Sequence, residues 1–205
     1  MRARIFFEKK LANRYTSILD LQKIWERALR RASLSVEMTK GFNPHAKIQI
    51  ANPLPVGFIG RNEIVDIFLD NPYSVEWIQD QLIDVLPEGI KIKKILLVPD
   101  KPKSLSDLYK NSEYLITIRD AHHSLIQNKI EQILIAEHIL RMRNRKEYDL
   151  RPLIYEIRMI SNLDNVVQIL VWLSAEPGKT GRPDEIVFHL GYKLTDCIIE
   201  RTRLF

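Results

Sequence analysis

The sequence is poor in residues that build covalent or metal-held sites. It has one cysteine, Cys197, in 205 residues, so no disulfide forms within the chain. A single thiolate also cannot hold an iron–sulfur cluster or a four-cysteine zinc site. The five histidines and seven glycines form no His-x-x-x-His pair, no nucleophile elbow and no phosphate-loop pattern. We therefore expect no metal and no cofactor in this chain.

Long apolar runs are also missing. No stretch approaches the roughly 18 consecutive apolar residues that a membrane-spanning helix needs, so we expect no membrane partner. The start, MRARIFFEKK, holds a short apolar run before charges return, which is not typical of a signal peptide. Together with the lone cysteine, this predicts a protein of the reducing cytoplasm.

Charge of either sign is present without a strong excess. The chain has 31 Lys and Arg against 26 Asp and Glu, for a net charge of +5, and 45% hydrophobic residues. The hydrophobic fraction is sufficient for a buried core. The positive balance favours a polyanionic partner such as nucleic acid without identifying one.

Hydrophobic periodicity predicts strands and helices in the same order in both halves of the chain. In the first half we predict strands at 2–9, 34–38, 47–52, 63–70 and 90–98, with helices at 16–32 and 74–86. In the second half we predict strands at 113–119, 165–175 and 196–205, two more strands within 138–160, and helices at 124–137 and 182–192.

This order predicts an α+β protein of two tandem ferredoxin-like units, each an antiparallel sheet with helices on one face. The expected units are residues 1–99 and 113–205. The polar segment 100–112, which contains Pro102, is the expected linker.

The segment Lys40–Gly57, KGFNPHAKIQIANPLPVG, is the first candidate site. Gly41 permits a positive φ, and Asn43-Pro44 marks a tight turn. An aromatic ring beside cations suits stacking on a base next to a phosphate. The plainer interpretation is a rigid connector with Phe42 tucked beneath it. The candidate binding residues are Lys40, Gly41, Phe42, Asn43, Pro44, His45 and Lys47.

Arginines form the second group of candidates. In ILRMRNRK, strand alternation would place Arg141, Arg143 and Arg145 on one face, which suits phosphates but also suits a solvated edge strand. Further candidates lie off the apolar stripe of the first helix, at two Arg-Pro steps and on the last strand. They are Arg27, Arg30, Arg31, Arg151, Arg182, Arg201 and Arg203.

Candidate catalytic groups are few. His45 is a weak candidate for metal-independent RNA cleavage, with Tyr15 or Lys47 supplying the second proton-transfer group. The residues therefore give only a weak signal for catalysis by this chain.

The segment SILDLQKIWERALRRASLSVEMTKGFNPHAKIQIANPLPVG, with the later YDLRPLI, RPDE and ERTRLF, resembles the radical-SAM-linked family, a bacterial domain of unknown function with a GFNPH…PLPVG signature. The resemblance implies a radical SAM protein in trans that carries an iron–sulfur cluster and S-adenosylmethionine. Ile18 stands where the family often has a histidine. This departure from the family pattern weakens an enzymatic interpretation and favours a binding role without catalysis by this chain.

These observations lead us to expect an accessory RNA-binding protein that presents structured RNA to a radical SAM enzyme, in tRNA or rRNA modification. Two alternatives stay open. One is a metal-independent endoribonuclease of RAMP-like fold, and the other is a protein-interaction subunit of the radical SAM partner that does not contact RNA.

Overall fold

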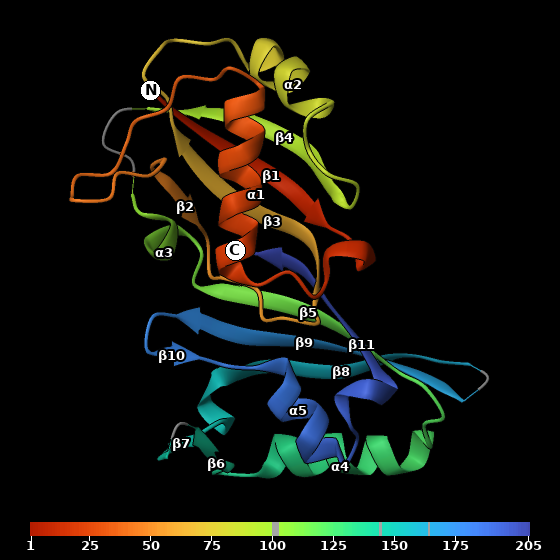
Figure 1. Ribbon diagram of the computed structural model, residues 1–205. Coiled ribbons are helices and arrows are strands. Elements are labelled where there is room, and N and C mark those ends of the chain that lie inside the picture. Colours follow the sequence, from red (N-terminus) through yellow and green to blue (C-terminus); the bar gives the residue numbers. More distant parts are fainter. Residues whose placement is uncertain (100–102, 144, 164) are drawn as a thin grey trace. The chain divides into compact units, whose positions relative to one another are not determined.

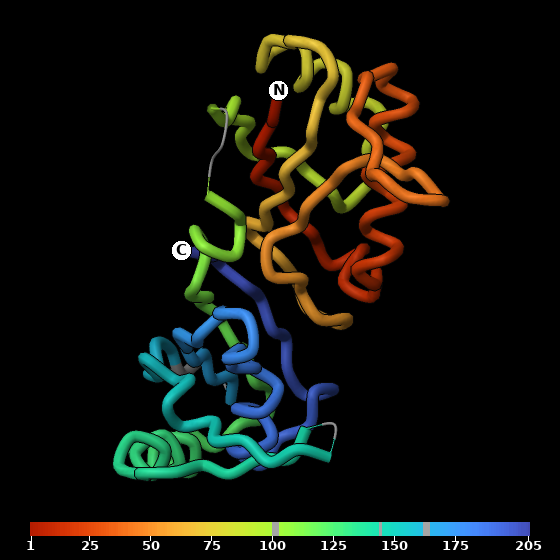
Figure 2. Tube along the Cα trace, turned by 90° about the vertical axis from the view of Figure 1, so that its left-hand side faces the viewer, coloured from red at the N-terminus to blue at the C-terminus, as the bar shows by residue number. Residues whose placement is uncertain are grey.

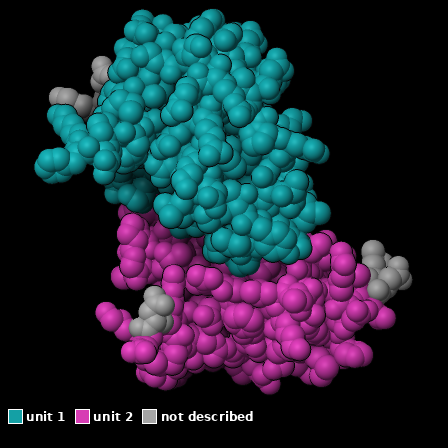
Figure 3. Space-filling model, in the orientation of Figure 1, with its two compact units in different colours: residues 1–108 teal, residues 109–205 magenta. Residues whose placement is uncertain are grey.

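The computed structural model describes residues 1–99, 103–143, 145–163 and 165–205. The chain divides into two compact units, Met1–Leu108 and Tyr109–Phe205 (Figure 3). This boundary lies inside the segment 100–112 that the sequence suggests as a linker. Residues 100–102 of that segment lie outside the described residues, and Leu105–Leu108 forms a short helix, α3.

Unit 1 is a four-stranded antiparallel sheet with helices, whose strands run in the order β2-β3-β1-β4 (Figure 1). Its elements, in addition to α3, are β1 (Arg2–Lys9), a 3-10 turn (Leu11–Asn13), α1 (Ile18–Arg31), β2 (Ile48–Ile50), β3 (Ile59–Phe68), α2 (Val75–Ile83) and β4 (Ile90–Val98).

The two longer helices of unit 1, α1 and α2, each begin at a serine cap. The Ser17 side chain accepts a hydrogen bond from the backbone N–H of Asp20, and Ser74 accepts one from Trp77. Each cap satisfies an N–H that lacks a partner within the helix. The strand expected at 34–38 is not continuous. It forms two isolated bridges with different partners, Val36 with Leu69 and Met38 with Ala46.

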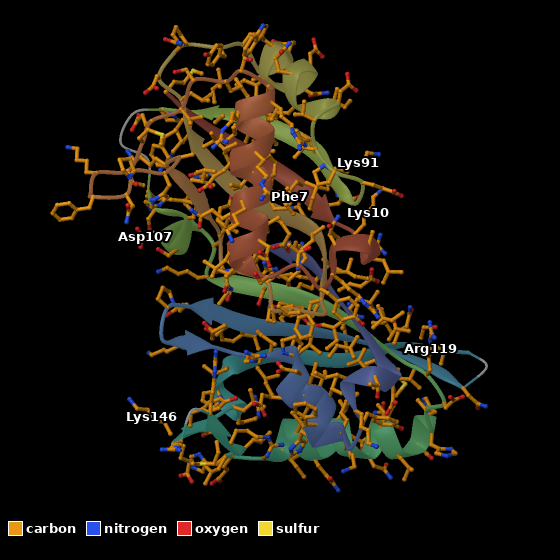
Figure 4. The ribbon with its side chains drawn as sticks, in the orientation of Figure 1. Phe7, Lys10, Lys91, Asp107, Arg119 and Lys146 are labelled. Atoms are coloured by element: carbon orange, nitrogen blue, oxygen red, sulfur yellow. The ribbon has the colours of Figure 1, made fainter. Side chains whose placement is uncertain are left out.

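The core of unit 1 lies between α1 and the sheet. Leu21, Trp25 and Ala28 are buried on the inner side of α1. The Trp25 ring meets the Phe7 ring of β1 edge-on, with centroids 5.2 Å apart, and Figure 4 shows Phe7 beneath the helix. The opposite side of α1 is therefore exposed to solvent.

Unit 2 has a similar layout. Its elements are β5 (Asn111–Ile118), α4 (His123–Ile135), β6 (Leu140–Arg143), β7 (Lys146–Asp149), a 3-10 turn (Arg151–Leu153), β8 (Ile154–Leu163), β9 (Val166–Glu176), β10 (Lys179–Thr180), α5 (Pro183–Leu190), a 3-10 turn (Leu194–Asp196) and β11 (Cys197–Leu204). Its main strands pair antiparallel in the order β8-β9-β5-β11, and β10 pairs with the end of β9.

The region 138–160 differs from the sequence prediction. It contains three strands instead of two, because β6 and β7 form a separate two-stranded sheet before β8 begins. The α+β class and the antiparallel pairing are confirmed. Within the described residues, no helix is both long and apolar enough to cross a membrane.

Candidate nucleic-acid interface

The solvent side of α1 carries four exposed cations, Lys23, Arg27, Arg30 and Arg31, here called the α1 basic face. Arg27 lies four residues after Lys23, three before Arg30 and four before Arg31, so its side chain neighbours the other three on the helix surface. Among the described residues, no hydrogen bond or ion pair links any of them to a carboxylate. Like charges at this spacing repel one another, and a bound polyanion would relieve the repulsion.

The segment Thr39–Ala46, here called the Phe42 loop, extends from unit 1 as a narrow turn (drawn in orange in Figures 1 and 2). Its base is closed by the N–H of Thr39, which donates to the His45 carbonyl at 2.8 Å. Phe42 at the tip is 106% exposed. Gly41 has a φ of +152°, with open space where a Cβ would stand. The plainer interpretation of this segment, a rigid connector with Phe42 tucked beneath it, is therefore wrong.

His45 braces this loop. Its backbone N–H donates to the Thr39 hydroxyl at 3.2 Å, and its Nδ1 lies 3.1 Å from that hydroxyl and 3.3 Å from the Asn43 carbonyl oxygen. Since a carbonyl can only accept, the contact with Asn43 requires the proton on Nδ1. Thr39 was not a sequence candidate. Its position before the Gly-Phe-Asn-Pro turn is the signal that could have identified it.

The groups suggested for catalysis are not assembled around His45. The Lys47 ammonium donates to the Glu37 carboxylate at 2.7 Å and lies 4.1 Å from the Phe68 ring centroid. The Tyr15 hydroxyl accepts a bond from Arg14. Among the described residues, no hydrogen bond joins His45 to either Lys47 or Tyr15.

The three arginines of ILRMRNRK do not share one face, which corrects the sequence expectation. The strand β6 ends at Arg143, and Arg145 lies in the hairpin turn with a φ of +63°. Arg143 is exposed, whereas Arg141 donates to His189 Nδ1 and lies 3.7 Å from the Glu185 carboxylate. Burial, followed by the charge of Arg141, lowers the pKa of His189, so its neutral ring can accept this bond.

The two Arg-Pro arginines are engaged within unit 2. Arg151 donates to the carbonyl oxygens of Ile154 at 3.1 Å and Leu134 at 3.3 Å. Arg182 precedes α5 and donates from Nε and Nη2 to the Asp184 carboxylate, a bond that raises the pKa of Arg182. Asp184 supplies negative charge in the first turn of α5, where the helix dipole favours an anion, so Arg182 is already paired with a carboxylate of its own unit.

The arginines of the last strand are also not on one exposed face, because the β11–β5 register shifts between Arg201 and Arg203. Arg201 is fully buried. Arg203 donates to Glu113 at 2.9 Å and lies 4.9 Å from the Phe205 ring centroid. Burial acts to raise the pKa of Glu113, but hydrogen bonds from Thr202 and two other donors outweigh this effect and lower the pKa.

A comparison with protein-family models matches residues 2–183 to the family described as "Uncharacterized protein conserved in bacteria (DUF2344)". The chain belongs to this family. The expected membership of an uncharacterized bacterial family is confirmed, and the link to a radical SAM enzyme stays a prediction.

Solved structures resemble this DUF2344 chain in fold. A chain of the "Cbf5-Nop10-Gar1 Complex" aligns with a TM-score of 0.56 at 12% identity, over 98% of this chain and 48% of that chain. A chain of the "archaeal box H/ACA sRNP Nop10-Cbf5 complex" aligns with a TM-score of 0.51 at 12% identity, over 98% and 47%.

A third similar chain comes from "H/ACA RNP bound to a substrate RNA containing 2'-deoxyuridine", with a TM-score of 0.50 at 12% identity, over 98% and 47%. The DUF2344 chain thus spans about half the length of the chains that it matches. No curated protein matches it.

The residues of this chain do not fit an iron–sulfur cluster, which requires several thiolate ligands. Burial, and then the charge of Asp196, raise the pKa of Cys197 to about 12, so the thiol stays protonated. Among the residues that the structure describes, no group of three or more His, Cys, Asp or Glu side chains is placed to hold a metal ion.

Proposed function

We propose that this chain binds structured RNA and presents it to a separate radical SAM enzyme in tRNA or rRNA modification. The observation that carries the proposal is Phe42, which is 106% exposed at the tip of a braced loop. A fully exposed phenylalanine leaves apolar surface in water without stabilising the fold. Stacking on an unpaired base would cover that surface.

The cations of unit 1 support the same interpretation. Lys40 is exposed beside Phe42, and the α1 basic face adds four cations without carboxylate partners among the described residues. An aromatic ring together with free cations suits single-stranded or looped RNA, in which bases and phosphates are both accessible.

The fold gives further support. In both units the second, third, first and fourth main strands lie side by side in that order, with helices after the first and third strands. Both units are therefore ferredoxin-like in this proposal, as the sequence order predicts. The similar solved chains come from complexes whose titles describe RNA–protein particles.

The proposed radical SAM partner would supply the cluster-binding cysteines that this chain lacks. The single cysteine of this chain cannot form the cluster of a radical SAM enzyme, so the cluster and S-adenosylmethionine belong to the partner in this proposal. Both proteins would act in the cytoplasm.

The test is binding of purified protein to total tRNA and rRNA across a salt series, in chelator, with RNA integrity read on the same gels. We expect binding to intact RNA that weakens steeply with salt. Replacing Arg27 and Arg31 with glutamine should lower the slope of log K against log salt by roughly 1.4 to 1.8, because each phosphate contact contributes about 0.7 to 0.9.

The matched control replaces Lys91 and Lys94, two exposed lysines of β4, and removes the same charge from the same unit. An equal slope change in both variants would mean that total charge, and not the α1 basic face, binds RNA. RNA fragments in chelator that disappear with His45→Ala would establish the nuclease alternative. No binding at low salt would leave the protein-interaction alternative.

A further inference from the structure

A second exposed aromatic ring lies just before α1. Tyr15 stands between the 3-10 turn Leu11–Asn13 and Ser17, the cap of α1. The Arg14 guanidinium lies over the Tyr15 ring, with its central carbon 4.6 Å from the ring centroid, and donates a hydrogen bond to the Tyr15 hydroxyl. Tyr15 is 67% exposed despite this cover, so the other face of its ring is open to solvent.

Backbone hydrogen bonds hold the segment that carries this ring. The Lys10 N–H donates to the Gly89 carbonyl at 2.8 Å, and the Arg14 carbonyl accepts from the Gly57 N–H at 2.7 Å. Gly57 is the last residue of the PLPVG motif, so this motif positions Tyr15, whereas the GFNPH part of the same signature presents Phe42. The Tyr15 ring is therefore exposed on a fixed backbone, and a ligand that stacks on it has little ordering left to impose.

The α1 basic face begins close to this ring in the sequence. The helix starts at Ile18, and its exposed cations follow from Lys23 to Arg31. Two views show the 3-10 turn before Tyr15 at the end where α1 begins (Figures 1 and 2). The 14 residues of α1 span about 21 Å, and a stacked strand rises about 3.4 Å per nucleotide. A strand of roughly six nucleotides whose phosphates follow α1 would therefore bring a base to Tyr15.

The charges around Tyr15 favour an uncharged group on the ring. Two cations, Lys10 and Arg14, are balanced by two exposed carboxylates, Asp20 and Glu88, and Asp20 accepts a hydrogen bond from the Ser17 hydroxyl at 2.7 Å. A neutral base therefore fits this position better than a phosphate does, and the phosphates fit the α1 basic face.

We infer that Tyr15 is a second base-stacking site, which takes an unpaired base of an RNA strand whose phosphates lie on the α1 basic face. The inference rests on the proposed function, because both require RNA on that face. It adds that the RNA presents at least two unpaired bases, one for Phe42 and one for Tyr15. Double-stranded RNA does not meet this requirement, because its bases are stacked on one another.

The test titrates the full chain into a labelled single-stranded oligoadenylate of about 12 nucleotides, a length that single-strand-binding modules cover. We expect Tyr15→Ala to weaken binding roughly 5- to 150-fold, the effect of losing one stacked base. Tyr15→Phe should keep the affinity because it keeps the ring. Tyr15→Ala removes no charge, so the slope of log K against log salt should stay the same. Binding to the duplex of this strand with oligouridylate should not change, because its bases cannot reach the ring.

Two matched controls separate stacking from other effects. Leu19→Ala removes an equally exposed aliphatic side chain, 67%, from the start of α1, and Tyr155→Ala removes a 55% exposed tyrosine from unit 2. Each should change the affinity for the oligoadenylate by less than about twofold. Circular dichroism and urea unfolding check the fold, and Tyr15→Ala should unfold at the same urea concentration as wild type, because the ring is exposed.

Binding that Phe42→Ala weakens and Tyr15→Ala does not would overturn this inference and leave the proposed function standing. If the wild-type chain binds neither the oligoadenylate nor tRNA, both are wrong. An equal loss in Leu19→Ala would indicate apolar contact in place of stacking, and an equal loss in Tyr155→Ala would indicate a non-specific effect. A wild-type dimer that Tyr15→Ala converts to monomer, with RNA affinity retained, would assign the ring to a second copy of this chain.

Discussion

Phe42→Ala should separate RNA binding from folding more cleanly than any other single substitution in this chain. Because Phe42 is 106% exposed, truncating it removes no buried contact, and the free energy of unfolding should change by less than about 0.5 kcal/mol. If the ring stacks on one base, the same change removes about 1 to 3 kcal/mol of binding free energy. That range corresponds to a loss of RNA affinity of roughly 5- to 150-fold.

The assay is titration of labelled tRNA with protein. All variants are compared at one fixed salt concentration, because RNA affinity depends steeply on salt. Phe42→Tyr should keep the affinity because it keeps the ring. Phe42→Leu should lose affinity nearly as much as the alanine variant, because it keeps apolar surface but cannot stack. Phe188→Ala is the matched control, since Phe188 is 51% exposed in unit 2.

A change of less than about twofold in Phe42→Ala would refute base stacking. So would an equal loss in the Phe188 control. Retained RNA affinity in Phe42→Leu, together with a loss in Phe42→Ala, would indicate apolar contact in place of stacking.

Three further predictions concern stability and reactivity. Asp66 is fully buried and accepts two hydrogen bonds from Arg4, at 2.8 Å and 2.9 Å. Asp66→Ala should therefore lower the free energy of unfolding, measured in urea, by about 3 to 5 kcal/mol. A decrease of less than about 1 kcal/mol would contradict the pairing. A rise in the pKa of Cys197 from 9.0 to about 12 should slow its alkylation at pH 8 about a thousandfold relative to the chain in urea. The lowered pKa of Glu113 means that its ionised form stabilises the fold above the unfolded-state pKa, and that this contribution is lost as pH falls through the folded-state pKa. The free energy of unfolding should therefore fall less steeply in acid for Glu113→Gln than for wild type.

The helices could be predicted from sequence because their signals are local. The stripe of Leu21, Trp25 and Ala28 and the cap at Ser17 place α1 at 18–31, inside the predicted 16–32. Ser74 likewise marks the start of α2 (Val75–Ile83), inside the predicted 74–86. Hydrophobic spacing and a capping hydroxyl lie within a few residues of each other, so no tertiary information is needed.

The arginines could not be assigned from sequence because their surroundings come from distant segments. Arg141 turns toward α5, which begins at Pro183, and Arg201 is displaced from the Arg203 face by a bulge in the pairing with β5. Alternation shows which residues share a face, but not which face is covered. The Phe42 loop was easier to recognise, because Gly41 and Asn43-Pro44 create the turn locally.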